Sequence, residues 1–464
     1  MVDAATLVGT VDELGAGLRA GDFTVRELTA AYLDRLERVG PELNAVVTVT
    51  RERALDAADE LDAELAAGTD RGPLHGIPFG VKDLLAVDGY PTTWGAAPLE
   101  DRTADDTATV VERLEAAGGV LIGKLAMVEM AGGFGYEQAD ASFTGPGLTP
   151  WSPDSWSGGS SSGAGSAVPT GLVGFAIGSE TWGSIVGPAT YCGVAGLRPT
   201  YGRVSRHGAM ALSWTMDKLG PLCRSAAGCE HVLRAVAGPD PEDETTVDRP
   251  LDGGASDPPT VAVLDGAAED AQPGVRANYE ASLEVIAEFA AVETVELPSY
   301  PYEEAAQLII SGEAAAAFDD FVEAGHAEEL TAPADRVGAY ANQAVLAKDY
   351  LNAMRVRRRA RRDLDDLLAG YDALVTPSQS TVAIPTDTTF EDYREDYEIP
   401  PVGAAANLAG LPGLSVPNGF GERDLPTGLT FTGRAYDDLA VVELAREYQR
   451  RTDHVDYGDL LDRF

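Results

Sequence analysis

Two glycine- and serine-rich loops decide how this chain is interpreted. Residues 158–200 read GGSSSGAGSAVPTGLVGFAIGSETWGSIVGPATYCGVAGLRPT. The first loop contains Ser160, and the second contains Ser184, which follows 24 residues later. Upstream, residues 72–83 read GPLHGIPFGVKD and contain Lys82. Each loop alone is typical of an ordinary turn or linker. Neither has the Gly-Lys-Ser/Thr ending of a phosphate-binding P-loop. The order of one lysine followed by two serine loops is what indicates chemistry.

Lys82 is the candidate base for a serine nucleophile. A serine hydroxyl is a poor nucleophile unless a neighbouring group takes its proton. None of the five histidines lies in a Gly-x-Ser-x-Gly setting. An arginine at position 82 could not be deprotonated, whereas a buried lysine can be. Without burial, deprotonating the lysine amine at pH 7 would cost roughly 4.6 kcal/mol, because its usual pKa is about 10.4. The structural alternative is a lysine that pairs with Asp83 or holds loop carbonyls.

Together, these motifs resemble the amidase signature family, serine hydrolases that use a Ser-Ser-Lys triad. The resemblance implies that Ser184 attacks an amide carbonyl and that Ser160 passes the proton of Ser184 to neutral Lys82. It also implies a cis peptide bond before Ser160, and an acyl-enzyme that water then hydrolyses. The implied oxyanion hole consists of backbone N–H groups of Thr181, Trp182, Gly183 and Ser184. Neither a metal nor an organic cofactor is implied.

The nucleophile loop departs from the common form of that family. Residues 180–186 read ETWGSIV, where the family usually has Asp-Thr-Gly-Gly-Ser-Ile-Arg. The arginine two residues after the nucleophile is therefore replaced by Val186, and Trp182 replaces a glycine. These changes retain the triad but leave the substrate open. They count against the glutaminase subunit of the tRNA-dependent amidotransferase, which has the arginine form. We expect Trp182, Gly132 and Gly133 to narrow the acyl side of the substrate pocket.

The resemblance implies an α/β fold, with one large mixed β-sheet covered by helices on both faces. We expect a single amidase domain over residues 1–464, with a signature core at about 72–221. The rest of the domain is expected to comprise a variable helical cover at about 239–370, followed by C-terminal core strands and a helix at 371–464. Local patterns predict several elements directly. They are a helix from Val25 to Leu36 capped by Thr24, strands at 260–264 and 294–297, a helix ending near 290, a helix at 345–369, core strands within 371–377 and 406–413, and an exposed loop at 239–259.

The charge composition is unusual. The formal net charge is −41, from 34 basic and 75 acidic residues spread along the chain, and lysine is scarce. Such a surface is typical of proteins from a high-salt cytoplasm, because a Debye length of about 3 Å at 1 M salt screens the repulsion. It argues against binding to nucleic acid or to anionic membranes. One basic cluster, Arg355 to Arg362, could bind phosphate or RNA. We interpret it instead as pairing with acids such as Asp363 and Asp365.

The remaining features set the expected partners and location. The three cysteines, Cys192, Cys223 and Cys229, match no metal-site spacing and give no disulfide framework. No targeting or transmembrane segment is recognised, so we expect a cytoplasmic enzyme that hydrolyses a small-molecule amide. The sequence leaves open whether the protein forms a homodimer. Two alternatives remain: a glutaminase subunit that needs partner subunits, and a catalytically silent binding protein on the same scaffold.

Overall fold

The centre of the molecule is one twisted sheet of eleven strands. The computed structural model describes residues 2–461 and 463–464. Its strand order is β1-β3-β2-β4-β6-β5-β10-β11-β9-β7-β8. The strands are β1 (Val46–Val49), β2 (Pro78–Lys82), β3 (Val120–Leu125), β4 (Phe175–Glu180), β5 (Ala195–Arg198), β6 (Lys218–Cys223), β7 (Thr260–Leu264), β8 (Ala291–Val295), β9 (Ala373–Pro377), β10 (Gly413–Phe420) and β11 (Pro426–Thr432).

The sheet is mixed, as predicted. Strand β2 runs parallel to both β3 and β4, and β7 runs parallel to both β8 and β9. The pairs between β4 and β9, which include β5, β6, β10 and β11, are all antiparallel. Strands β2 to β6 and β9 are buried along their whole length. The few charged residues in them, such as Lys82, Glu180 and Arg198, are therefore removed from water and need polar partners.

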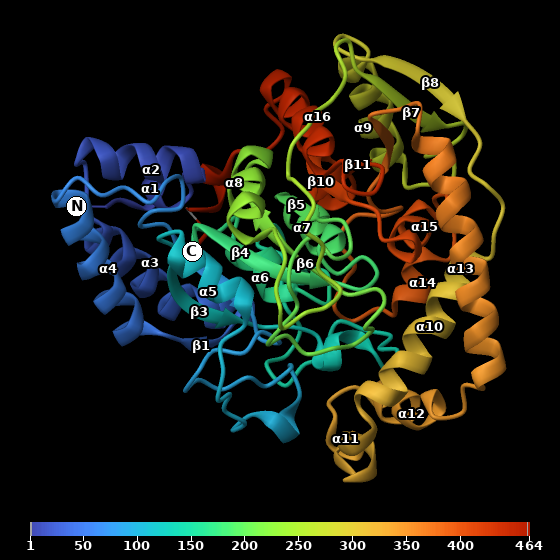
Figure 1. Cartoon of the computed structure of the whole chain (residues 1–464), viewed down its shortest axis with the longest axis horizontal. Helices are drawn as coiled ribbons and strands as arrows, with labels where there is room; N and C mark the ends of the chain where they lie inside the picture. The colour runs from blue at the N-terminus through green and yellow to red at the C-terminus, as the bar shows by residue number, and fades with distance from the viewer. Residues whose placement is uncertain (1, 462) are drawn as a thin grey trace.

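Helices cover both faces of the sheet (Figure 1). Helix α7 packs on β5, β10 and β11, and helices α9 and α16 also pack on β10 and β11. The helices are α1 (Ala4–Leu7), α2 (Val11–Ala20), α3 (Val25–Val39), α4 (Arg51–Ala66), α5 (Thr109–Ala116), α6 (Ser162–Ala167), α7 (Val186–Cys192), α8 (Ala226–Val236), α9 (Pro273–Ile286), α10 (Tyr302–Ala317), α11 (Asp319–Glu323), α12 (Pro333–Asn342), α13 (Ala347–Leu368), α14 (Phe390–Arg394), α15 (Val402–Ala409) and α16 (Asp438–Arg451).

Several predicted elements are present within a few residues of their expected bounds. Helix α3 begins at the predicted cap, where the Thr24 side chain accepts from the N–H of Glu27 in a capping box. Strand β7 has the predicted bounds, and α13 lies within the predicted 345–369. Helices α10, α12 and α13 pack together as the helical cover, which Figure 1 shows beside α15 at one end of the sheet.

Two local predictions need correction. Residues 406–409 were expected to be part of a core strand, but they are the last turn of α15, and the strand begins at Gly413. Seven of the eight residues of α15, all but Gly403, are buried. The segment therefore lacks the periodic alternation of apolar and polar residues that identifies a helix in a sequence. The 239–259 loop is irregular as expected, but it is not exposed throughout. Asp240 and Asp243 are buried and accept hydrogen bonds from Ser205 and from the Arg206 N–H.

Two further features bear on how the molecule behaves. All three cysteines, Cys192, Cys223 and Cys229, are free thiols buried in the core. In the described part of the chain, no helix combines the length and the apolar composition that a membrane crossing requires.

Candidate active site

Three neighbouring segments of the core bring Lys82, Ser160 and Ser184 together. Lys82 is the last residue of β2, and β4 pairs with β2 and leads directly into the Ser184 loop. Ser160 lies in the loop before α6, which packs on both strands. The Gly159–Ser160 peptide bond is cis, as the resemblance implies. The parallel pairing of β2 and β4 places the lysine and the nucleophile loop at the same edge.

The three side chains form a continuous hydrogen-bonded chain. Lys82 Nζ lies 2.7 Å from Ser160 Oγ and 2.9 Å from Ser179 Oγ. Ser160 Oγ donates to Ser184 Oγ over 3.1 Å. Lys82 is fully buried, whereas Ser184 keeps 8% of its surface exposed. The hydrogen-bonded chain therefore connects a slightly exposed serine hydroxyl to a fully buried amine.

The Lys82 amine is fully buried and has no carboxylate partner among the described residues. Burial lowers its pKa to about 7, although the charges of Asp217 and Glu180 oppose the shift. The predicted structural alternative, a Lys82–Asp83 ion pair, is not formed. Asp83 pairs instead with Lys124 over 2.8 Å, and it also accepts from the N–H of Thr93. Among the described residues, the hydrogen-bond partners of the Lys82 amine are two serine hydroxyls.

The turn before Ser184 presents a row of unused backbone donors. The N–H groups of residues 181–184 have no acceptor among residues 2–461 and 463–464. Gly183 has a φ of +84°, a conformation that favours glycine and that a side chain would strain. The following N–H groups of Ile185 and Val186 are already bound by Glu180 Oε2, at 2.8 and 3.0 Å. The free donors are therefore confined to the turn that contains Ser184.

Glu180 holds this turn in place through partners that the sequence did not reveal. Its other oxygen, Oε1, pairs with Arg198 over 2.8 Å and accepts from Asn407 Nδ2 over 2.8 Å. Burial opposes its ionisation, but Arg198, Lys218 and the hydrogen bonds lower its pKa to about 2. Arg198 thus supplies a positive charge to the acidic residue of the loop, although Val186 stands where the family usually has arginine.

Asp217 and Lys218 brace the other side of the turn. Asp217 Oδ1 accepts from the Thr181 hydroxyl over 2.6 Å, and Lys218 Nζ lies 3.4 Å from the Thr181 carbonyl oxygen. An ion pair between these two residues, which their adjacency suggests, is not formed in the described chain. Burial and then the charge of Arg198 lower the pKa of Lys218 to about 7. No spacing in the sequence links either residue to Thr181.

A cleft of about 530 Å³ opens in front of the two loops. Its lining includes Gly158 and Gly159 from the first loop and Trp182 and Gly183 from the second. The predicted pocket residue Trp182 therefore faces this space. Gly132 and Gly133 are not among its lining residues. Gly132 lies against the ring of Tyr136, which lines the cleft, so this predicted residue could shape the cleft only indirectly.

Arg394 is a polar feature of the cleft that sequence patterns did not indicate. It ends α14, and its Nη2 donates to the Tyr191 hydroxyl over 2.9 Å. Within the described residues, no carboxylate oxygen lies within 4.0 Å of it, although Glu303 and Glu398 line the same cleft. A guanidinium with no carboxylate partner can bind an acidic group of a ligand in two-pronged fashion.

Comparisons with known proteins agree with this geometry. The sequence pattern that defines the family described as Amidase matches residues 27–442. The chain belongs to the amidase family. This amidase is 37% identical to the A subunit of glutamyl-tRNA(Gln) amidotransferase from Halorhodospira halophila, over 96% of this chain and 97% of that protein.

Solved structures place the amidase among similar folds. The native peptide amidase of Stenotrophomonas maltophilia superposes with a TM-score of 0.81 and 32% identity, over 96% of both chains. A protein from a vestigial complex, studied for the origins of an s-triazine catabolic enzyme, gives a TM-score of 0.87 at 29% identity. That match covers 95% of this chain and 98% of the other. The predicted family, the mixed α/β fold and the class of amide-cleaving hydrolase are thereby confirmed.

Proposed function

We propose that this amidase hydrolyses a carboxylic amide through an acyl-enzyme formed on Ser184. The observation that carries the proposal is the buried chain from Ser184 Oγ through Ser160 Oγ to Lys82 Nζ, with steps of 3.1 and 2.7 Å. A lysine whose pKa is about 7 is partly neutral at neutral pH and can accept a proton.

The proposed reaction has two stages. Ser184 Oγ bonds to the amide carbonyl carbon while its proton passes to Ser160, whose own proton passes to neutral Lys82. The carbonyl oxygen becomes negative and accepts hydrogen bonds from the free N–H groups of residues 181–184. The C–N bond then breaks, and the nitrogen leaves with the proton returned through Ser160. Water hydrolyses the resulting ester by the same route, which releases the acid and restores Ser184.

The direct test is release of ammonia from a panel of primary amides in multimolar KCl, with wild type beside Ser184→Ala and Lys82→Ala. We expect each substitution to lower kcat by at least about 10³-fold, because triad members act as a unit. A fluorophosphonate probe that labels wild type but not Ser184→Ala would locate the nucleophile. If the folded wild type shows no turnover and no labelling, the proposal is contradicted and a catalytically silent binding protein is favoured.

A glutaminase subunit is the second candidate, and the similarity to glutamyl-tRNA(Gln) amidotransferase subunits over nearly the whole chain favours it. Against it stands the replacement of the usual loop arginine by Val186. Affinity purification from the native host distinguishes the two candidates. Stable co-purification of two further subunits, together with glutamine as the best amide, would support the second. A free enzyme that prefers other amides would support the first.

A further inference from the structure

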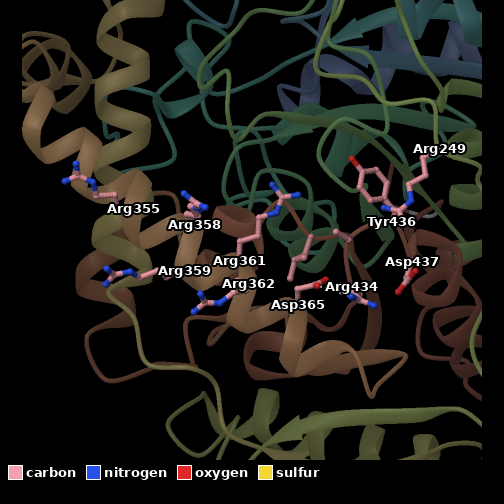
Figure 2. A pocket seen from close by; sticks show the side chains of 12 residues that line it. Arg249, Arg355, Arg358, Arg359, Arg361, Arg362, Asp365, Arg434, Tyr436 and Asp437 are labelled. Atoms are coloured by element: carbon pink, nitrogen blue, oxygen red, sulfur yellow. Dashed lines mark hydrogen bonds and ion pairs between the residues drawn. The ribbon is translucent and has the colours of Figure 1, made fainter.

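A surface groove lies apart from the cleft (Figure 2). Its volume is about 840 Å³, and it lies between α13 and the segments around residues 249 and 434–437. Its lining is dominated by arginine, although the whole chain has 75 acidic residues and only 34 basic ones. The lining residues are Arg249, Arg355, Arg358, Arg359, Arg361, Arg362, Asp365, Leu411, Arg434, Ala435, Tyr436 and Asp437.

Most of these positive charges have no carboxylate partner in the described part of the chain, although Arg355 donates to the neutral Asn352 Oδ1 over 2.9 Å. Arg362 pairs with Asp363 over 2.8 Å, and Arg434 pairs with Asp365 over 2.6 Å. The predicted pairing of the cluster Arg355 to Arg362 with Asp363 and Asp365 therefore holds only for Arg362 and Asp363 in the described chain, because Asp365 pairs with Arg434, outside that cluster. No carboxylate oxygen of the described residues lies within 4.0 Å of the other five guanidinium groups, which belong to Arg249, Arg355, Arg358, Arg359 and Arg361. Like charges three or four residues apart on a helix repel one another, so clustering these arginines has an electrostatic cost that a bound anion would offset.

Hydrogen bonds from the buried Arg203 and the half-buried Arg357 fix the two walls of the groove. On the far wall, the buried Arg203 donates to the carbonyl oxygens of Arg249, at 2.8 Å, and of Tyr436, at 3.1 Å. Its guanidinium and that of Arg249 also pack against the Tyr436 ring, 4.9 and 4.6 Å from the ring centroid. On the near wall, Arg357 turns inward from α13 and donates to the Leu408 carbonyl over 2.8 Å. Figure 2 shows Arg361 extending toward the Tyr436 and Arg249 side.

We propose that this groove binds a small anion with two or more linked phosphate groups, either free pyrophosphate or the diphosphate of a nucleotide. Guanidinium groups bind phosphate oxygens through pairs of charge-assisted hydrogen bonds. The volume lies within the range of small-ligand sites, about 300–1,000 Å³. A polynucleotide fits less well, because it would extend beyond the groove over a surface rich in carboxylates.

Calorimetric titration of the full chain tests the proposal, with pyrophosphate, ADP and adenosine as ligands at about 0.2 M and 2 M KCl. We expect both phosphates to bind and adenosine not to bind. The double variant Arg358→Gln/Arg361→Gln should raise Kd by about tenfold or more, since each charge-assisted hydrogen bond lost costs about that factor. The control is Arg276→Gln, an arginine of α9 with no carboxylate partner in the described chain, which should leave Kd unchanged.

Each outcome decides the proposal. Equal affinities for pyrophosphate and ADP support the proposal and assign binding to the phosphates. A higher affinity for ADP than for pyrophosphate also supports it and indicates an additional contact with the nucleoside. Equal Kd values in the double variant and the control would overturn it, as would the absence of phosphate binding to folded wild type. Tighter binding of a single-stranded RNA of about 20 nucleotides, dependent on the same arginines, would also overturn it in favour of a nucleic-acid site. Circular dichroism melting shows whether each variant is folded.

Discussion

At the scale of single residues, the protonation of Lys82 governs the proposed relay. Only the neutral amine can accept a proton, and burial sets the pKa of Lys82 at about 7. We therefore expect kcat/KM to rise about tenfold per pH unit below pH 7 and to level off above it. A pH–rate profile measures this directly. Lys82→Arg is the matched variant, because it keeps the charge but cannot lose it, and it should be inactive at every pH. A profile that stays flat from acid to neutral pH would assign the base elsewhere.

Arg394 makes a second residue-level prediction, about the substrate. With no carboxylate partner in the described chain and a position in the cleft, it should bind an acidic group on the acyl chain of the amide. Arg394→Gln is expected to raise KM for such amides by about tenfold, the loss of one charge-assisted interaction. Neutral amides of similar size serve as the internal control and should keep their KM. An equal rise in KM for both classes would indicate a general distortion of the cleft.

The residues that carry the site differ in how far the sequence could reveal them. Lys82, Ser160 and Ser184 stand in short motifs, so their type and order were readable, and the fold brings them together. Glu180 binds Asn407, which is 227 residues away in the chain. No local spacing encodes such a contact, because tertiary packing alone creates it. Local spacing likewise does not show which arginines between Arg355 and Arg362 point inward, which pair with a carboxylate and which have no carboxylate partner in the described chain.

At the scale of secondary structure, local chemistry explains which predictions held. Strand β7 was predicted with the right bounds because its Thr-Val-Ala-Val-Leu run is rich in β-branched residues and follows a proline-rich turn. Helix α3 was predicted because Thr24 and Glu27 form a readable cap. The prediction for residues 406–409 was wrong because a short helix that is buried at every position but Gly403 has no clear amphipathic pattern.

The capping box of α3 gives the element-level prediction. Thr24→Ala removes the acceptor for the Glu27 N–H, at 3.0 Å, and disrupts the reciprocal bond from Glu27 to the Thr24 N–H. The free energy of unfolding should fall by about 1 kcal/mol. Urea denaturation followed by circular dichroism measures it. Thr69→Ala replaces an exposed threonine outside any helix or strand and should change stability by less than about 0.5 kcal/mol. Equal effects at both sites would show that the cap contributes nothing specific.

At the scale of the whole molecule, the formal net charge of −41 predicts a strong response to salt. Raising KCl from about 0.1 M to 1 M shortens the Debye length from about 10 to 3 Å and screens the repulsion between surface carboxylates. The melting temperature should therefore rise steeply over this range. An equal osmotic strength of sucrose, which screens no charge, is the control. Comparable stabilisation by sucrose would attribute the effect to solute exclusion instead.

The arrangement of the whole sheet was the least readable property of the sequence. The resemblance predicted a mixed sheet, but strand β5 pairs with β10 more than 200 residues later, at Arg198 and Gly413. That pairing places the chain segment just before β10, which contains Leu411, next to Arg198 at the end of β5. Strand order of this kind follows from how apolar faces are buried together, and no segment encodes it alone.

The burial of all three cysteines has a practical consequence for observing motion in this enzyme. Buried thiols in apolar surroundings react slowly, and burial raises the pKa of both Cys192 and Cys223. The native surface therefore offers no competing thiol, and a cysteine introduced at the rim of the cleft or the arginine groove would be the preferred target of a maleimide dye. Pairs of such labels would report opening and closing by fluorescence energy transfer without first stripping the chain of its own cysteines.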